Sequence, residues 1–277
     1  MSKSLPRILQ AAREYVKRGW SLVPIPRGEK GPHLTDWPNL RLTESDLPKH
    51  FSARENMGVI LGEASGGLID VDLDCKEALA VADSLLPTTP SVFGRASKLR
   101  AHRFYYCGET ILSHKYSAPD GTCLVELRSK GQQTVVPPSI HPSGEVVTWT
   151  SDGEPAPMDG TALSRAVAKV AAAALLVINW PASDRHVARM ALGGTLARAD
   201  WPEEEAISFI QSVIKIAQPD DHEAYGKVAG DTRAAFSKLE RSESVTGLTR
   251  LAKLVGPDVV SYRGLYPTIP TAGPTPR

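Results

Sequence analysis

The feature that most constrains this 277-residue chain is the run at residues 66–74, with the sequence GGLIDVDLD. Its period of two predicts a strand with apolar side chains on one face and Asp70, Asp72 and Asp74 on the other. Two such charges about 4 Å apart repel by about 4 kcal/mol at an effective dielectric of about 20. Hard divalent cations bind carboxylate oxygens, so the run predicts a Mg²⁺ or Mn²⁺ site at the end of a core strand.

The alternative is a polar edge strand whose outer face is acidic. The apolar half of the run consists of strong β-formers, which favours a buried strand and therefore the metal site. A Ca²⁺ loop is excluded, because it requires Gly at its sixth position and Glu at its twelfth, where this chain has Cys75 and Val81.

Composition excludes only a few classes of function and of metal site. The chain has 32 Lys+Arg against 31 Asp+Glu, a net charge of +1, so a basic surface for nucleic acid must be local. Its three cysteines have no paired spacing, which predicts a reducing, cytoplasmic location. Cys107, His114 and Cys123 match no zinc pattern and lack a fourth ligand, so zinc is not expected. The apolar run 171–178 is too short to span a bilayer, and no membrane partner is expected.

The periodicities predict an α/β (α+β) domain followed by a small all-α domain. Helices are expected over 6–18, 76–86 and 161–179, and strands over 20–25, 56–61, 103–106 and 123–128. Residues 134–149 have the pattern of a β-hairpin with a proline-fixed turn. The predicted domains are 1–157, a connecting helix 158–180, a helical domain 181–260 and a Pro-rich tail or linker 261–277.

A basic segment precedes the aromatic strand. It gathers five residues within nine positions, with Ser97 among them: Arg95, Lys98, Arg100, His102 and Arg103. Such a set is able to cradle a triphosphate, although a charge run is also typical of a solvated surface. Lys30, in a Gly- and Pro-rich loop, has the same two interpretations. Glu126 lies among apolar neighbours in the alternating strand 123–128.

The order of these features resembles the bifunctional primase/polymerase (prim-pol) domain of the archaeo-eukaryotic primase superfamily, a type common in phages and plasmids. Its acidic-x-acidic motif falls on Asp70 and Asp72. Its second motif, a small polar residue and a His, falls on Ser97 and His102, with a longer gap than usual. Its third acid, commonly Asp, falls on Glu126. The stretch 133–144, QTVVPPSIHPSG, is the most family-specific.

The resemblance covers residues 5–150 well and the helices of 180–256 more loosely. It implies an RRM-like mixed sheet and a DNA primase/polymerase that makes or extends strands on single-stranded DNA from nucleoside triphosphates. Asp70, Asp72 and Glu126 would be the catalytic and metal-binding residues, for two Mg²⁺ or Mn²⁺ ions. Nucleotide-binding residues would be Arg95, Ser97, Lys98 and His102, with His141 placed by the resemblance only. A replicative helicase, fused or separate, is a further candidate partner.

Two other functions stay open at this stage. A nucleotide-sugar transferase also uses Asp-x-Asp at a strand end, but it requires neither Glu126 nor the His102 segment. A replication initiator or single-stranded-DNA-binding module would keep the fold without activity. The set formed by the three acids and His102 argues against the latter.

Overall fold

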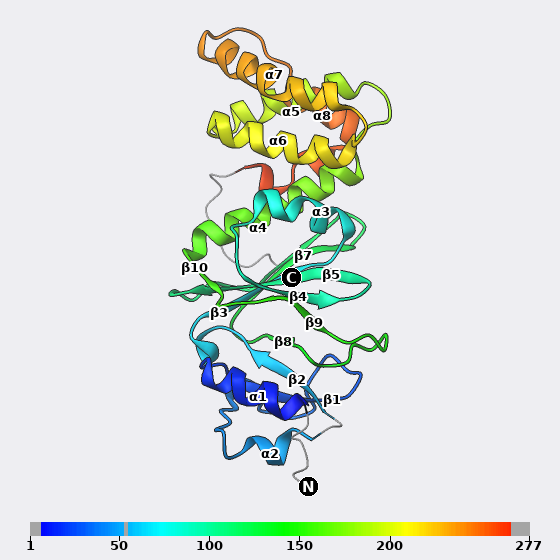
Figure 1. Cartoon of the computed structure of the whole chain (residues 1–277). Helices are drawn as coiled ribbons and strands as arrows, with labels where there is room; N and C mark the ends of the chain where they lie inside the picture. Colours follow the sequence, from blue (N-terminus) through cyan, green and yellow to red (C-terminus); the bar gives the residue numbers. More distant parts are fainter. Residues whose placement is uncertain (1–6, 53–54, 267–277) are drawn as a thin grey trace. The chain divides into compact units, whose positions relative to one another are not determined.

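Two β-sheets form the framework of the N-terminal half in the computed structural model, which describes residues 7–52 and 55–266 (Figure 1). The strands in these residues are β1 (Leu22–Pro26), β2 (Glu55–Ile60), β3 (Leu68–Leu73), β4 (Ser91–Arg95), β5 (Lys98–Cys107), β6 (His114–Ser117), β7 (Cys123–Arg128), β8 (Gln133–Val135), β9 (Thr148–Asp152) and β10 (Ala156–Met158). One sheet has the order β1-β2-β8. The other has the order β6-β7-β3-β5-β4-β9, with β10 parallel to β5.

Helices make up nearly all of the described C-terminal region. The α-helices of the described chain are α1 (Arg7–Lys17), α2 (Leu47–His50), α3 (Lys76–Leu85), α4 (Gly160–Ile178), α5 (Arg185–Arg198), α6 (Glu203–Ala217), α7 (His222–Glu240), α8 (Leu248–Val255) and α9 (Pro257–Val260). Local sequence explains several helix starts: the Cys75 side chain caps α3, Asp221 caps α7, and three glutamates occupy the first turn of α6. The predicted α+β fold, with a mixed sheet and a helical region after it, is confirmed.

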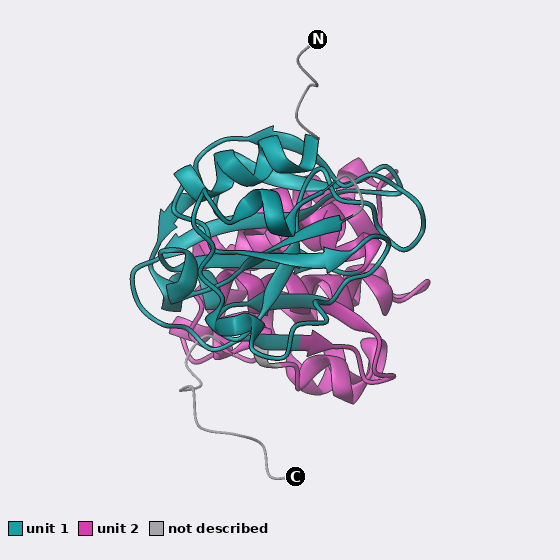
Figure 2. Ribbon diagram, turned by 90° about the horizontal axis from the view of Figure 1, so that it is seen from below, with its two compact units in different colours: residues 1–74, 87–115, 125–164 teal, residues 75–86, 116–124, 165–277 magenta. Residues whose placement is uncertain are grey.

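The chain divides into two compact units (Figure 2). Unit 1 comprises residues 1–74, 87–115 and 125–164, and unit 2 comprises residues 75–86, 116–124 and 165–277. Unit 2 therefore takes in two segments from inside the predicted domain 1–157. The domain bounds 1–157, 158–180 and 181–260 stay a prediction. Of the predicted tail 261–277, residues 267–277 lie outside the described residues.

Strand β3 is central rather than peripheral, so the interpretation as an edge strand is wrong. It pairs antiparallel with β5 on one side and with β7 on the other. All six residues of β3 are buried, the two aspartates included. Asp70 and Asp72 of β3 are therefore shielded from bulk solvent.

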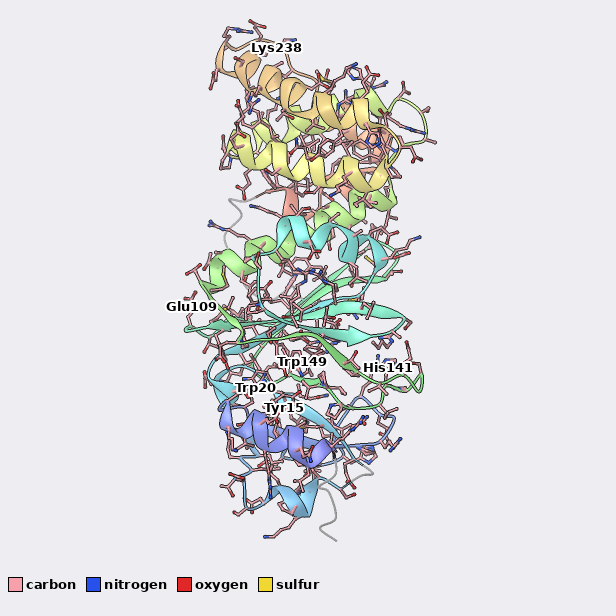
Figure 3. All side chains as sticks on the ribbon, viewed as in Figure 1. Tyr15, Trp20, Glu109, His141, Trp149 and Lys238 are labelled. Carbon is pink, nitrogen blue, oxygen red and sulfur yellow. The ribbon has the colours of Figure 1, made fainter. Side chains whose placement is uncertain are left out.

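An aromatic core supports unit 1 beneath these strands (Figure 3). Tyr15 of α1 lies against Trp20 and Trp149, with ring centroids 5.0 and 6.2 Å away. The Tyr15 hydroxyl accepts a hydrogen bond from Trp149 Nε1 and donates one to Pro137 O. The core continues to Phe93 of β4, whose ring is 4.9 Å from that of Trp149. Because Phe93 also contacts a site residue, the core fixes part of the site.

The hairpin predicted over 134–149 is wrong in its strand pairing, although the chain does reverse there, with one antiparallel bridge between Ile140 and Val146. Strand β8 pairs with β2 in one sheet, whereas β9 pairs with β4 in the other, and residues 136–147 cross between them. Pro137 and Pro138 have no N–H to continue a ladder. Side chains bind the crossing segment instead: Ser139 Oγ accepts a hydrogen bond from Met57 N, and Asn56 bonds both the N–H and the carbonyl of Ile140.

Helix α4 extends the apolar run 171–178 back to Gly160. Within the described residues it is the one helix long and apolar enough to cross a membrane, with 19 residues and a mean hydropathy of 1.7. Half of that stretch is buried, and a core helix passes the same test. Its length and composition therefore decide nothing about a membrane.

Candidate functional site

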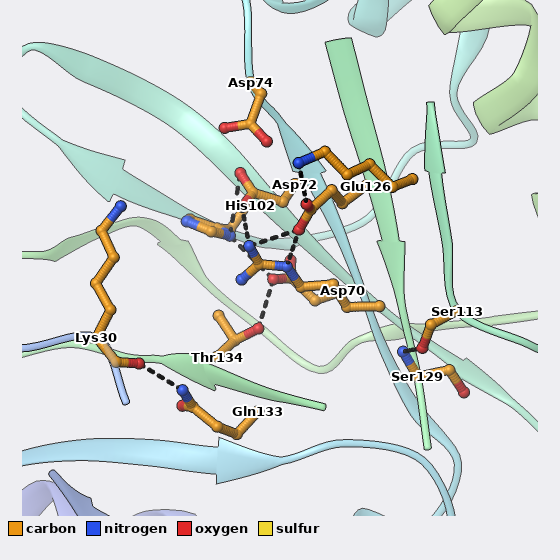
Figure 4. Close-up of polar contacts among 12 residues, drawn as sticks. Lys30, Asp70, Asp72, Asp74, His102, Ser113, Glu126, Ser129, Gln133 and Thr134 are labelled. Carbon is orange, nitrogen blue, oxygen red and sulfur yellow. Dashed lines mark hydrogen bonds and ion pairs between the residues drawn. The ribbon is translucent and has the colours of Figure 1, made fainter. Parts of the chain in front are cut away.

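The register of three strands gathers the site on one face of the large sheet. Asp72 of β3 lies opposite His102 of β5 and Glu126 of β7. Asp70 lies opposite Arg128 at the end of β7. Cross-strand neighbours share a face, and residues i and i+2 of a strand do as well, so all five side chains face the same way. Figure 4 labels Asp70, Asp72, His102 and Glu126 in this group. The sheet therefore brings together the three predicted catalytic acids.

Asp70 is the deepest of the acids, with no exposed surface. Its Oδ2 accepts a hydrogen bond from Thr134 Oγ1 at 2.7 Å and contacts His102 Nδ1 at 3.0 Å. Its Oδ1 is buried and has no hydrogen-bond partner among the described residues. A buried carboxylate oxygen without a donor is an acceptor that a cation would satisfy.

Arg128 is the principal residue that the sequence analysis missed. Its Nη2 lies 2.9 Å from Asp72 Oδ2 and 2.7 Å from Glu126 Oε2, and its Nε donates to Glu126 Oε2 at 2.8 Å. The signal was present in the sequence, since Arg128 follows Glu126 by two positions and therefore shares its face of β7. The neighbouring acids raise the pKa of Arg128, against the effect of burial.

Two lysines complete the charge balance of this cluster. Lys98 at the start of β5 forms an ion pair with Asp74 at 2.9 Å and lies 3.9 Å from Asp72 Oδ1. Lys115 lies 3.6 Å from Glu126 Oε1, with its side chain more than half exposed. The four carboxylates of the cluster thus each have a basic side chain within ion-pair distance. The predicted phosphate ligand Lys98 pairs with acids in this state.

Electrostatics shifts the two central titratable groups in the same direction. Burial raises the pKa of Asp72, and the charges of Asp70 and Asp74 raise it further, although His102 and Arg128 oppose this. Burial alone would lower the pKa of His102, but the carboxylates of Asp72 and Asp70 raise it above its ordinary value. The ring of His102 stacks on Phe93 with centroids 4.7 Å apart, which fixes its orientation.

A cavity of about 230 Å³ opens beside the acids. Its lining carries basic side chains in excess of acidic ones: Lys30, Arg95, Lys98 and Arg128, with His102 and His141, against Glu29, Asp72 and Asp74. The backbone carbonyl of Lys30 accepts a hydrogen bond from Gln133 Nε2, which ties its loop to β8 (Figure 4). Four of the five predicted nucleotide-binding residues line this cavity.

Ser97 does not line the cavity. Its N–H and its hydroxyl both donate to Glu145. Glu145 Oε1 accepts from Ser97 N at 2.7 Å, and Oε2 accepts from Ser97 Oγ, Arg95 Nε and Ser143 Oγ at 2.8 to 3.0 Å. These hydrogen bonds lower the pKa of Glu145 to about 2. They join the β4–β5 turn to the loop that carries His141. We call this set, Arg95, Ser97, Ser143 and Glu145, the rim clamp.

His141 lies on the loop side of the cavity (Figure 3). Its Nδ1 contacts Ser143 Oγ at 2.8 Å. Its buried Nε2 has no hydrogen-bond partner among the described residues. Burial and the nearby charges of Arg95 and Lys30 lower its pKa, so the neutral ring is favoured.

The donor set fits hard divalent cations. Asp70, Asp72, Asp74 and Glu126 offer oxygen ligands, which Mg²⁺ and Mn²⁺ prefer. The unpartnered Asp70 Oδ1 is a buried carboxylate oxygen that no donor of the described residues satisfies, and burial raises the pKa of Asp72. The arrangement can therefore hold metal beside a basic cavity of a size and charge suited to phosphates.

Comparison with known proteins agrees with this geometry. The family model described as "Bifunctional DNA primase/polymerase, N-terminal" matches residues 12–160, which is more than half of the chain. The matched residues include the four carboxylates Asp70, Asp72, Asp74 and Glu126, which we call the acid cluster. They also include the cavity beside these acids and the rim clamp. No curated protein matches the chain.

Proposed function

Because the chain belongs to the bifunctional DNA primase/polymerase family, we propose that it performs template-directed nucleotidyl transfer on single-stranded DNA, using nucleoside triphosphates to make or extend a strand. The observation that carries this proposal is the juxtaposition of two features. Asp70, Asp72 and Glu126 share one face of two paired strands, and a cavity lined by basic side chains lies beside them.

The three acids are the proposed metal ligands and catalytic residues. Asp70, Asp72 and Glu126 would hold two Mg²⁺ or Mn²⁺ ions, with Asp74 as an additional carboxylate. When bound, such ions activate the attacking 3′-hydroxyl and stabilise the leaving pyrophosphate. Within the protein, Thr134 and His102 orient the Asp70 carboxylate by their contacts to Oδ2.

The basic lining is the proposed triphosphate site. Arg95, Lys98 and His102 approach from β4 and β5, and Lys30 and His141 from two loops. The positive charge of Lys30, Arg95 and Lys98 would neutralise the phosphates of the incoming nucleotide and of the leaving group, and the neutral ring of His141 would offer a hydrogen bond. Ser97 is assigned a supporting part, because its hydroxyl and its N–H are both engaged by Glu145.

Several finer assignments rest on sequence alone. We propose that the helical region from about residue 181 to 260 assists the binding of template or initiating nucleotide. A cytoplasmic location, a phage- or plasmid-type origin and a helicase partner are proposed on the same basis.

The test is nucleotide incorporation on single-stranded DNA with and without a primer, in Mg²⁺ and in Mn²⁺. The expected result is metal-dependent synthesis that Asp70→Ala with Asp72→Ala abolishes and Glu126→Ala abolishes too. Tight binding of single-stranded DNA without incorporation under either metal would contradict the proposal and favour a replication initiator. Mild loss in Glu126→Ala would instead favour a nucleotide-sugar transferase.

A further inference from the structure

The guanidinium of Arg128 lies between carboxylate oxygens of two of the proposed metal ligands, Asp72 and Glu126. One nitrogen, Nη2, is within 2.9 Å of Asp72 Oδ2 and 2.7 Å of Glu126 Oε2. Mg²⁺ binds its oxygen ligands at about 2.0–2.1 Å, closer than either of these contacts. A metal ion held by either of these oxygens at that distance would exclude the Arg128 guanidinium from its present position.

Charge makes the conflict stronger than geometry alone. A divalent ion beside a guanidinium repels it, and the ion pairs that hold Arg128 among the described residues are those with Asp72 and Glu126. The side chain is about a quarter exposed and lines the cavity, so it has open space next to it. Entry of a metal would therefore release Arg128 toward the cavity.

The cavity offers Arg128 a second partner once a nucleotide is present. The planar guanidinium fork binds two phosphate oxygens at once, a geometry that a lysine cannot reproduce. Lys30, Arg95 and Lys98 already give the cavity a positive lining. A triphosphate bound there would give Arg128 new anionic partners in place of Asp72 and Glu126, which would then bind the metal.

We propose that Arg128 is a displaceable internal counterion. It neutralises Asp72 and Glu126 before the metal binds, and it moves to the phosphates of the nucleotide when metal and nucleotide enter together. This inference rests on the proposed nucleotidyl transfer, since it assigns metal and triphosphate to the same site. Its consequence is that the protein binds metal weakly by itself and more tightly with nucleotide, a coupling that is reciprocal.

Metal affinity measured without nucleotide is the first test. Free Mn²⁺ is followed by electron paramagnetic resonance as it is titrated into the wild type, Arg128→Gln and Lys115→Gln. The Lys115 variant is the matched control, because it also removes one positive charge that contacts Glu126 but does not lie between two acids. Arg128→Gln is expected to bind Mn²⁺ on the order of tenfold more tightly than wild type, within the range usual for coupled sites.

Lys115→Gln is expected to change Mn²⁺ affinity by less than about fivefold, as for an exposed ion pair. Arg128→Lys keeps the charge and serves if Arg128→Gln does not fold. It should bind Mn²⁺ more tightly than wild type, because an ammonium cannot replace both Nε and Nη2. Equal changes in Arg128→Gln and Lys115→Gln, or unchanged affinity in Arg128→Lys, would overturn the proposal.

The side chain itself is the second readout. The Nε–H signal of Arg128, assigned by its loss in Arg128→Lys, is recorded by NMR with Mg²⁺ and a non-hydrolysable nucleoside triphosphate, separately and together. The largest shift is expected with Mg²⁺ and the nucleotide together, and an unchanged signal in protein shown to bind both would contradict displacement. Both measurements report binding and not synthesis. A protein without incorporation activity can still show displacement of Arg128, and an active protein can lack it, so the two proposals are tested separately.

Discussion

Two carboxylate networks border one cavity, and different forces set the charge of each. In the acid cluster, Asp72 is buried beside other acids, and burial raises its pKa. In the rim clamp, Glu145 accepts hydrogen bonds from Ser97 and Ser143 as well as Arg95, and its pKa falls to about 2. In the acid cluster, formed by Asp70, Asp72, Asp74 and Glu126, the buried Asp70 Oδ1 has no hydrogen-bond donor among the described residues. The rim clamp has its charge satisfied by donors that stay in place.

This difference indicates that the acid cluster is suited to bind a cation, whereas the rim clamp holds two loops together. Desolvated carboxylates gain from a metal because the ion replaces the water that they lost. A carboxylate that already accepts four contacts gains nothing from one. Substitutions in the acid cluster should therefore affect metal binding and chemistry, whereas substitutions in the rim clamp should affect the position of the cavity walls.

The largest expected effect is that of Asp72→Asn on catalysis. Removing a central metal ligand should reduce incorporation by about a thousandfold or more, because metal assistance is worth several kcal/mol. The measurement is single-turnover nucleotide incorporation on primed single-stranded DNA. Retained incorporation by a folded Asp72→Asn protein would contradict the assignment of the acid cluster.

Glu145→Gln should act on the other network. The amide cannot accept from all of the donors that now face the carboxylate, so the β4–β5 turn and the His141 loop separate slightly. We expect a rise in KM for the nucleotide of up to about 10²-fold, with kcat less affected and Mn²⁺ affinity unchanged. A loss of Mn²⁺ affinity would remove the distinction between the two networks.

The pH dependence of stability should differ in sign between the two acids. Glu145 has a folded-state pKa of about 2 against an ordinary value of 4.5, so its charge stabilises the fold above pH 4.5 and this contribution is lost as the pH falls toward 2. The melting temperature of wild type should exceed that of Glu145→Gln at neutral pH. The gap should close as the pH falls from 4.5 toward 2.

For Asp72 we expect stability to depend on pH in the opposite direction. Its folded-state pKa lies above its ordinary value of 3.8, so its ionisation destabilises the metal-free fold as the pH rises through the interval between the two. Without metal, Asp72→Asn should melt no lower than wild type at neutral pH, and any advantage should shrink as the pH falls. Parallel slopes for the two variants would show that the networks do not differ in this way.

Ser97→Ala should give the smallest effect. The substitution removes one side-chain hydrogen bond to Glu145 but leaves the one from the Ser97 N–H. Loss of one such bond costs about 1 kcal/mol, which limits the rise in nucleotide KM to about fivefold. If steady-state kinetics gives an effect larger than that of Glu145→Gln, Ser97 contacts the nucleotide directly.

The sequence predicted the acid cluster because its information is local. The alternation of residues 68–73 fixes both the strand and the shared face of Asp70 and Asp72, and the strand 123–128 was predicted with the bounds that the structure has. The basic segment before the aromatic strand likewise led to Arg95, Lys98 and His102. The shared face of Asp70 and Asp72 needed only the period of one strand, whereas the roles of Glu126 and His102 came from the resemblance to the family.

The remainder depended on contacts between distant segments. Arg128 was missed because its importance comes from the register of β7 against β3, which brings it to Asp72 from 56 positions away. Glu145 was missed for the same reason, since it binds a turn 48 positions earlier. The hairpin over 134–149 was predicted wrongly because a local pattern does not show that β8 and β9 belong to different sheets.

The central claim is that Asp70, Asp72 and Glu126 bind divalent metal together with a nucleotide. The most direct measurement is anomalous diffraction from crystals grown with Mn²⁺ and a non-hydrolysable nucleoside triphosphate. The account predicts Mn²⁺ peaks at ligand distance from these acids, with the triphosphate in the basic cavity. Peaks elsewhere, or an intact contact of Arg128 with Asp72 and Glu126 while the nucleotide is bound, would contradict it.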